Sequence, residues 1–294
     1  MAAAVAEPAS TIGAIGMWNG TKDGADDGYI DYSNGSTNLR GPKQFEVEIL
    51  DIRHLEYPPS YEKDGYGLIK HTPSITKEHF LAAETPEGKA FIQKVYFPEI
   101  EELVKSITGG KVVRTVSFRT RQQDLAPGSI GSKDMANKAL PVAHFDRDPE
   151  TAHSSLYEVF GDEAASLIAK YPRYAQVKVW RSISEPVQKW PLCFIDTTPV
   201  PNWSYETHTG RVFSRNDPRI SLRGKKDHDT VVKHDPRYKY RYVSNVGPDE
   251  AFVFSAFDSD ITRSTPHGAF WDKNSLPDAP PRRSIEIASW VFFE

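Results

Sequence analysis

Cysteine, long apolar runs and an excess of charge of one sign are all scarce in this sequence. The single cysteine, Cys193, cannot form a disulfide within the chain, and its apolar neighbours predict a buried thiol in a strand. No apolar run reaches the roughly 18 residues of a membrane-spanning helix. The first residues, "MAAAVAEPAS", contain no basic leader, so we expect a soluble protein of the cytoplasm.

The charges are nearly balanced, with 36 Lys and Arg against 40 Asp and Glu and a net charge of −4. Such a balance provides no global attraction to nucleic acid or to an anionic membrane. The expected partner is therefore a small-molecule metabolite, and composition gives no indication of the oligomeric state.

A chain of 294 residues is long enough for one large domain, and all-β domains often reach this size. Residues 1–42 are rich in Gly, Asp, Asn and Ala without a sustained apolar period, which predicts a flexible N-terminal arm or lid. Residues 43–294 are then expected to form the folded domain.

Within that domain, helical signals precede a series of strand signals. Residues 45–53 alternate as a strand does, residues 76–110 have a helical period that ends at two glycines, and 161–171 predict a second helix. Short β-rich runs follow at 174–183, 190–198, 237–246, 250–259 and 283–293. This order predicts a mainly β fold with flanking α-helices, best matched by a jelly roll.

Two short segments combine a histidine with an acidic residue two positions later. In a strand, residues i and i+2 point to the same face, so His144 and Asp146 in "LPVAHFDRDP" would present an imidazole and a carboxylate to one point. His54 and Glu56 in "IRHLEY" have the same spacing. Either pair suits a metal ion, but the spacing alone is a weak signal that also occurs at polar strand ends.

The C-terminal region supplies companions for such a pair. His267, in "STPHGAFWD", can be the distant histidine that a facial-triad non-haem iron site requires. Arg282 and Ser284 form another i, i+2 pair, and a buried guanidinium beside a hydroxyl is a good receptor for a carboxylate. This matches the R-x-S anchor of 2-oxoglutarate oxygenases. The order H-x-D, distant histidine, R-x-S favours the first pair as metal ligands over the second.

Longer motifs carry a family resemblance from about residue 43 to the C-terminus. They are "DGYGLIKHTPS", "VWRSISEPVQKWPLCFIDT", "YVSNVGPDEAFVFSAFDSD", "TPHGAFWD" and "PPRRSIEIASWVFF". Together they resemble the gibberellin-desaturase-like hydroxylase/desaturase family, which also contains the cephamycin hydroxylase type. Residues before about 43 lie outside the resemblance.

This resemblance implies a double-stranded β-helix that uses Fe(II), 2-oxoglutarate and O2 to tailor a secondary metabolite. It implies that His144, Asp146 and His267 hold the iron, and that Arg282 and Ser284 hold the distal carboxylate of 2-oxoglutarate. The implied reaction is hydroxylation or desaturation through a ferryl oxidant, with release of succinate and CO2.

One position departs from the family pattern, because Lys178 precedes "VWR" where we expect an asparagine. A lysine at this point of a strand could bind a carboxylate of the cosubstrate or of the substrate, or could lie at a solvated strand edge. We include Lys178 among the cosubstrate-binding candidates.

Three further residues are candidates for substrate binding. Trp180 and Arg181 alternate across a predicted strand, so one of the two is expected to face the cavity. His153 follows the H-x-D pair closely and is a candidate for contact with substrate, although an exposed position is the simpler expectation.

Two alternatives stay open at this stage. An iron oxygenase could act without 2-oxoglutarate, although Arg282 and Ser284 favour the cosubstrate. A non-catalytic protein could use the barrel to bind a metabolite or to support another enzyme, although a scaffold does not need three metal ligands. The substrate and the choice between hydroxylation, desaturation and ring closure are not encoded in the ligand motif.

Overall fold

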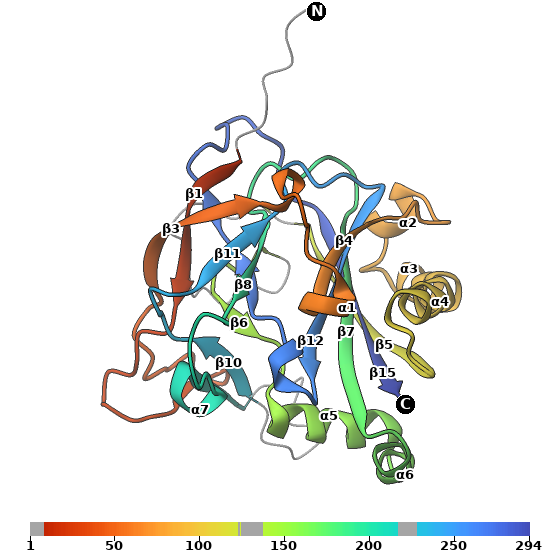
Figure 1. The fold of residues 1–294 in the computed structure, drawn as a ribbon, viewed down its shortest axis with the longest axis horizontal. Helices are drawn as coiled ribbons and strands as arrows, with labels where there is room; N and C mark the ends of the chain where they lie inside the picture. Colours follow the sequence, from red (N-terminus) through yellow and green to blue (C-terminus); the bar gives the residue numbers. More distant parts are fainter. Residues whose placement is uncertain (1–8, 123, 125–137, 217–227) are drawn as a thin grey trace, which may run out of the picture.

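Two β-sheets face each other, and helices cover the outer side of the smaller one (Figure 1). The computed structural model describes residues 9–122, 124, 138–216 and 228–294. Apolar side chains of both sheets meet between them, among them Phe194 from the larger sheet and Phe252 and Phe254 from the smaller. The predicted mainly β fold with flanking helices is confirmed.

The sheets contain ten and five strands. In spatial order, the larger sheet consists of β14 (Trp271–Asp272), β1 (Ser10–Met17), β3 (Lys43–Asp51), β11 (Lys239–Tyr242), β8 (Leu192–Asp196), β13 (His267–Ala269), β6 (His144–Phe145), β10 (His228–Val232), β9 (Thr209–Arg215) and β2 (Gly28–Asp31). The smaller sheet consists of β4 (Tyr66–Lys70), β12 (Glu250–Asp258), β7 (Arg173–Ser182), β15 (Ser284–Phe293) and β5 (Val112–Arg121). All five predicted β-rich runs from residue 174 onward contain one of these strands.

The region before residue 43 differs from the predicted arm. Strand β1 pairs with β3 over its whole length, from Ser10 opposite Leu50 to Met17 opposite Lys43. Ile15 and Met17 are fully buried. The two glycines and the single alanine of β1 conceal its alternation in the sequence, but they allow close packing, since a Cβ at Gly13 would lie only 2.3 Å from the Phe270 ring.

Short helices and turns join the strands. They are η1 (Ile52–His54), α1 (Tyr61–Asp64), α2 (Lys77–Leu81), α3 (Pro86–Phe91), the π-helical η2 (Ile92–Tyr96), α4 (Phe97–Thr108), α5 (Pro149–Phe160), α6 (Glu163–Lys170), α7 (Tyr205–His208) and η4 (Ile261–Arg263). The predicted helical region 76–110 thus forms α2 to α4. It ends at Gly109, which adopts the left-handed conformation with φ 70°.

Helix α5 is an element that the periodicity did not predict. Its start nevertheless follows known capping chemistry, because Asp148 accepts a hydrogen bond from the Thr151 N–H and Pro149 occupies the first helical turn. Helices α5 and α6 pack against Trp290 and Phe292 near the end of β15. They therefore close one end of the smaller sheet (Figure 1).

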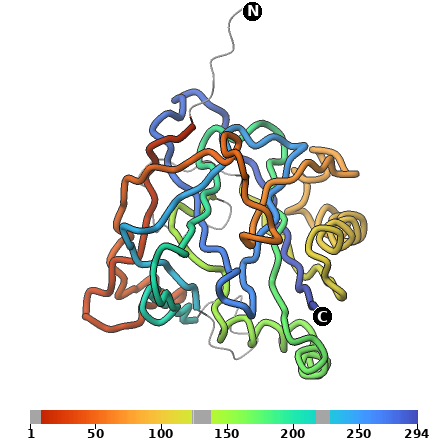
Figure 2. Tube along the Cα trace, viewed as in Figure 1, coloured from red at the N-terminus to blue at the C-terminus, as the bar shows by residue number. Residues whose placement is uncertain are grey.

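Strands β7 and β15 lie side by side although about one hundred residues separate them (Figure 2). On one face of β7, Val177 and Val179 pack against the α2 to α4 layer. On the other face, Lys178 and Trp180 point between the two sheets. The smaller sheet therefore separates a helix-covered core from the interior in which the predicted ligands lie.

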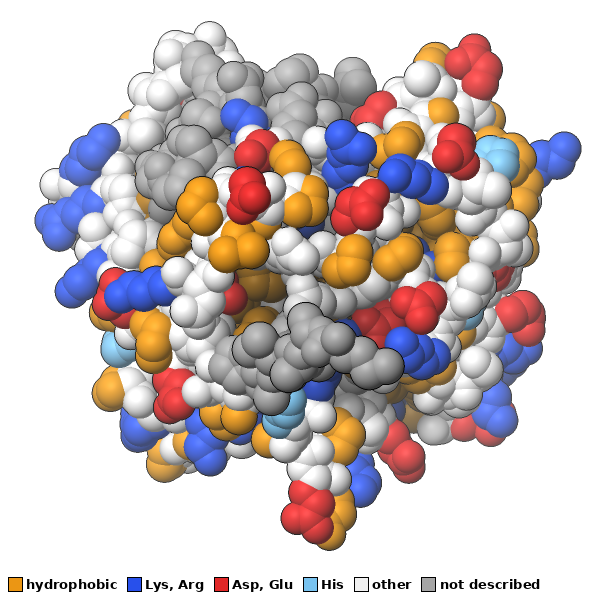
Figure 3. Space-filling view, turned by 90° about the horizontal axis from the view of Figure 1, so that it is seen from above, with side chains coloured by type: hydrophobic (Ala, Val, Ile, Leu, Met, Phe, Trp, Pro, Cys, Tyr) orange, Lys and Arg blue, Asp and Glu red, His pale blue; other side chains and the backbone are white. Residues whose placement is uncertain are grey.

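Charged side chains of both signs are interspersed on the face shown in Figure 3. This distribution agrees with the small net charge of the chain. None of the described helices combines the length and apolar character needed to cross a membrane.

Candidate metal centre and carboxylate anchor

Three predicted ligands from distant parts of the chain meet between the sheets. His144 opens β6, Asp146 follows that strand, and His267 opens β13, which pairs with β6 so that the two histidines are direct neighbours. One possible ligand atom from each residue lies within 4.8 Å of the other two. Two imidazoles and one carboxylate at this separation suit a facial-triad metal centre.

The two imidazoles are oriented by backbone carbonyl groups. His144 Nδ1 lies 2.8 Å from the Val142 carbonyl oxygen, and His267 Nδ1 lies 3.1 Å from that of Thr265. These contacts assign the N–H to Nδ1 and leave each Nε2 as a lone-pair donor. Burial, reinforced by the neighbouring His267, lowers the pKa of His144 to about 4, so its ring is neutral at physiological pH.

Asp146 offers one oxygen and has the other engaged. Its Oδ1 accepts a hydrogen bond from Lys178 Nζ at 2.5 Å. Its Oδ2 lies 3.3 Å from His267 Nε2 and is buried without a hydrogen-bond partner among the described residues. Although burial opposes ionisation, the charge and hydrogen bond of Lys178 together with the two neighbouring histidines outweigh it and lower the pKa of Asp146. A buried, ionised and unsatisfied oxygen beside two Nε2 atoms fits a bound cation.

The rival pair lies elsewhere and has a different environment. His54 ends η1, Glu56 follows it, and both side chains are exposed at the protein surface. The nearest acidic group to His54 is Asp51, whose Oδ2 is 4.0 Å from His54 Nε2. Among the residues that the structure describes, this pair therefore has the spacing of a metal site but belongs to no three-ligand group.

Arg282 and Ser284 lie at the start of β15 and are both buried. The Arg282 guanidinium donates from Nη1 to the Trp190 carbonyl at 2.7 Å and lies over the Trp180 ring at 5.6 Å. Its Nε and the Ser284 hydroxyl are buried and lack partners among the described residues. Burial, followed by repulsion from Arg121, lowers the pKa of Arg282 to about 9, so the guanidinium stays charged at neutral pH. Unsatisfied donors beside a buried positive charge fit a carboxylate.

Trp190, which holds Arg282, has an unusual backbone. Its φ is 52° although it is bulky and precedes Pro191, and both features disfavour the left-handed region. The residue is 3% exposed and its ring packs against Trp271 at 5.1 Å. Strain of this kind persists only where packing fixes it, and here it directs the Trp190 carbonyl to Arg282.

The substrate candidates occupy three different environments. Trp180 faces the interior and supports the Arg282 guanidinium. Arg181 lies on the helix-covered face, where it contacts the ring and the carbonyl of His71 and lies near the Tyr96 ring. His153 is exposed on α5 and packs beside Tyr157. Of the Trp180 and Arg181 pair, the tryptophan is therefore the residue that faces the metal ligands.

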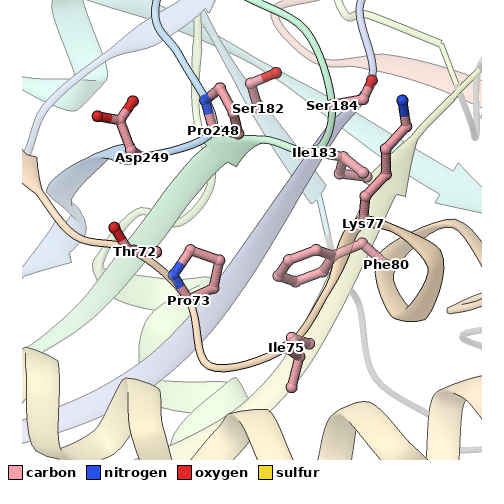
Figure 4. Close-up of a pocket in the computed structure, with 10 residues that line it drawn as sticks. All are labelled: Thr72, Pro73, Ile75, Lys77, Phe80, Ser182, Ile183, Ser184, Pro248 and Asp249. Atoms are coloured by element: carbon pink, nitrogen blue, oxygen red, sulfur yellow. The ribbon is translucent and has the colours of Figure 1, made fainter.

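A shallow pocket of about 270 Å³ lies beside the helix layer, at the end of β7 (Figure 4). Its apolar wall is formed by Ile75, Phe80 and Ile183, with Lys77 and Asp249 at its rim. It contains neither the metal-ligand candidates nor the Arg282 anchor, so it is distinct from the interior site.

Comparison with known proteins places these features in a family. The family described as oxidoreductase/YMDC permease-like domain matches residues 21–292. The chain belongs to this oxidoreductase family. It is 46% identical to "Oxidoreductase R1" of Phoma sp., over 97% of this chain and 98% of that protein. It is also 26% identical to "Gibberellin cluster GA4 desaturase" of Gibberella fujikuroi, over 77% and 79%. The predicted resemblance to hydroxylases and desaturases is thereby confirmed.

The fold of this oxidoreductase also matches a solved structure. The iron and alpha-ketoglutarate-dependent endoperoxidase NvfI superposes with a TM-score of 0.77 over 97% of this chain and 98% of that one, at 22% sequence identity. The predicted double-stranded β-helix fold is confirmed by this likeness.

The sequence analysis missed one charged residue of the site. Glu286 points into the same interior and accepts a hydrogen bond from Lys178 Nζ at 2.5 Å. The signal was present, because Ser284 and Glu286 are two residues apart on β15 and therefore share a face. Lys178 itself is 7% exposed, which excludes the solvated strand edge that was the alternative expectation.

Proposed function

We propose that this chain is an Fe(II)- and 2-oxoglutarate-dependent oxygenase that hydroxylates or desaturates a small metabolite. One observation carries the proposal: the His-Asp-His group and the Arg282–Ser284 pair face one interior, and each contains buried polar atoms without partners among the described residues. Relatives at 26–28% identity have names that include hydroxylase/desaturase and Fe(II)/2-oxoglutarate-dependent dioxygenase, which supports the same reaction class.

His144 Nε2, His267 Nε2 and Asp146 Oδ2 would hold the metal. The donor set of two imidazoles and one carboxylate is the set that favours Fe(II) in oxygenases. When bound, iron would supply the redox chemistry with O2 that no side chain can provide. The protein contributes the fixed direction of the three ligand atoms through the Val142 and Thr265 carbonyls and through Lys178.

Arg282 and Ser284 would bind the distal carboxylate of 2-oxoglutarate. Along β15, Ser284 lies two residues from Glu286, a separation of roughly 7 Å. Glu286 in turn contacts Lys178, which contacts Asp146. The anchor is therefore connected to the metal ligand Asp146 through Glu286 on β15 and Lys178 on the adjacent strand β7.

Lys178, the other cosubstrate candidate, has two carboxylate partners in the protein itself. We therefore infer that Arg282 and Ser284 bind the cosubstrate carboxylate, and that Lys178 acts as the partner of Asp146.

Trp180 and the phenylalanines that contact His267 provide an apolar wall for the substrate. One of these is Phe254, whose ring lies 4.7 Å from that imidazole. An apolar wall favours a substrate with an unactivated hydrocarbon portion.

Succinate formation tests this function. We expect the purified protein to convert 2-oxoglutarate to succinate when Fe(II), ascorbate and O2 are present, with faster conversion when the correct metabolite is added. The matched control is His267→Ala, which removes one metal ligand while leaving Arg282 and Ser284 in place.

Two results would contradict the proposal in different ways. Product formation that proceeds without 2-oxoglutarate would indicate an iron oxygenase that does not use this cosubstrate. Equal metal content in the wild type, His144→Ala and His267→Ala would indicate a non-catalytic protein or a metal site at another place.

A further inference from the structure

We propose that Lys178 and Glu286 form a charge-balanced clamp that restricts Asp146 to one metal-binding oxygen. The inference rests on the proposed function only in requiring that the His-Asp-His group binds a divalent metal. It assigns roles to two residues that are not metal ligands themselves, and Glu286 has no role in the pattern read from the sequence.

The clamp is built from two adjacent strands and the segment after β6. Lys178 on β7 extends into the interior, and its Nζ is 2.5 Å from Asp146 Oδ1 and 2.5 Å from Glu286 Oε1. The side chains of the three residues are 8%, 19% and 20% exposed for lysine, aspartate and glutamate. In the register of β7 and β15, Ala288 opposes Lys178 and Glu286 opposes Trp180, so Glu286 is the diagonal neighbour of Lys178.

The contact to Asp146 decides which oxygen is available. A free carboxylate can bind a metal through one oxygen or through both. Because Lys178 occupies Oδ1, only Oδ2 is left beside the Nε2 atom of His267, at 3.3 Å. A ligand limited to one oxygen occupies one metal position, which leaves three positions open for a chelating cosubstrate and O2.

The contact to Glu286 provides the charge balance. An ammonium group paired with Asp146 alone would compete with the metal ion for the same carboxylate and would repel the ion. Glu286 gives Lys178 a second counter-ion, so that the three side chains together carry one negative charge. A buried lysine with two carboxylate partners is also far less costly to desolvate than one with a single shared partner.

The geometry of Glu286 is also set by the sequence of β15. Ser284 and Glu286 occupy successive positions on one face of that strand, and Arg282 lies two residues before its first residue. A carboxylate so near the proposed carboxylate anchor would repel the cosubstrate if its charge were not neutralised. Lys178 neutralises it. The same ammonium group thus holds the metal ligand Asp146 and compensates the charge of Glu286 beside the proposed cosubstrate anchor.

Titration with Mn(II), followed by calorimetry or electron paramagnetic resonance, tests the charge balance without any turnover. We expect Glu286→Gln to weaken Mn(II) binding by about tenfold or more, in the range known for residues that contact metal ligands. We expect the double variant Lys178→Met/Glu286→Gln to bind Mn(II) within about threefold of the wild type, because both opposite charges are then absent.

The matched control is Glu250→Gln, which changes another buried, ion-paired glutamate that contacts Arg53 and not Lys178. It should leave Mn(II) affinity unchanged. Circular dichroism and thermal unfolding establish that each variant is folded at the titration temperature. Wild-type affinity in Glu286→Gln, or a double variant as weak as Glu286→Gln, would overturn the charge-balance role.

The restriction of Asp146 has its own readout. The visible bands of the Co(II)-loaded protein report ligand geometry, and we expect them to shift in Lys178→Met, where both Asp146 oxygens become available. Lys178→Arg, which keeps a donor and the positive charge, should retain bands closer to those of the wild type. Identical bands in the wild type and Lys178→Met would refute the restriction.

The two proposals can fail separately. If the wild type binds Mn(II) and His267→Ala does not, the metal centre is confirmed, and the Glu286 and Lys178 variants decide the clamp. If the wild type does not bind Mn(II) at these residues, both the metal centre and the clamp are refuted.

Discussion

Two segments of this chain have the same H-x-acid spacing but different environments. His144 and Asp146 lie between two sheets, with His267 on the neighbouring strand. His54 and Glu56 lie at the surface, at the end of a single 3-10 turn and just after it. The comparison teaches that spacing supplies two ligands, whereas the third ligand and the exclusion of water come from strand pairing.

The partners of the two segments differ as well. Around Asp146, a buried lysine engages one oxygen and leaves the other free for a cation. Around His54, the adjacent Arg53 forms a two-point ion pair with Glu250, with distances of 2.9 and 2.6 Å. The first segment is therefore suited to bind a metal, and the second joins η1 to the first residue of β12.

The largest effect should follow removal of a ligand at the interior segment. Asp146→Ala is expected to reduce Fe(II) or Mn(II) binding by more than about 100-fold, because it removes a ligand and not merely an outer partner. Metal analysis after equilibrium dialysis measures this loss. If Asp146→Ala still binds one equivalent of metal, Asp146 is not a required ligand and the interior segment is no better a metal site than the surface segment.

Arg282→Met should have the next largest effect, on the cosubstrate and not on the metal. Loss of a buried charged partner is expected to raise the KM for 2-oxoglutarate by about 100-fold, while Mn(II) affinity stays as in the wild type. Arg282→Lys should recover only part of the loss, since an ammonium cannot form the two-point contact of a guanidinium.

A smaller value is expected for Ser284→Ala, about fivefold in KM, because a neutral hydrogen bond contributes about 1 kcal/mol. Measurement of succinate formation against 2-oxoglutarate concentration gives these constants. An unchanged KM in Arg282→Met would show that another residue binds the cosubstrate carboxylate.

Stability is the property expected to respond at the surface segment. Burial would raise the pKa of Glu250, but the hydrogen bonds from Arg53 and Gly247 outweigh it and lower the pKa to about 2. A folded-state pKa below the unfolded value of 4.5 means that this group stabilises the fold above about pH 4.5. That stabilisation should be lost as the pH falls toward 2.

Glu250→Gln should therefore lower the free energy of unfolding by about 2 kcal/mol at pH 7, because it breaks hydrogen bonds to a charged group. The difference from the wild type should shrink as the pH falls below about 4.5. Denaturant unfolding at a series of pH values measures both quantities. A difference that does not change with pH would show that the charge of Glu250 is not responsible.

The smallest effect should come from the exposed pair itself. His54→Ala/Glu56→Ala is expected to change the free energy of unfolding by less than about 0.5 kcal/mol, as exposed substitutions usually do, and to leave metal content unchanged. The same dialysis and unfolding measurements apply. Loss of metal in this variant would show that His54 and Glu56, and not the interior pair, belong to the metal site.

Much of the β-rich half could be predicted from alternation and turn residues, as β7, β12 and β15 show. Strand β1 could not, because its small residues carry no apolar alternation and become meaningful only against Phe270 and β3. At the site, His144, Asp146, His267, Arg282 and Ser284 could be named from their types and order. Their convergence could not be measured, since it depends on pairing between strands that are far apart in the chain.

The sequence by itself determined the chemical types at the site, because side-chain identity and the two-residue period of a strand are local properties. Only the tertiary structure decided which H-x-acid pair received a second histidine, which Asp146 oxygen stayed free, and that Lys178 joins two carboxylates. The physical reason is that these properties arise from sheet register, which brings residues about one hundred positions apart into contact.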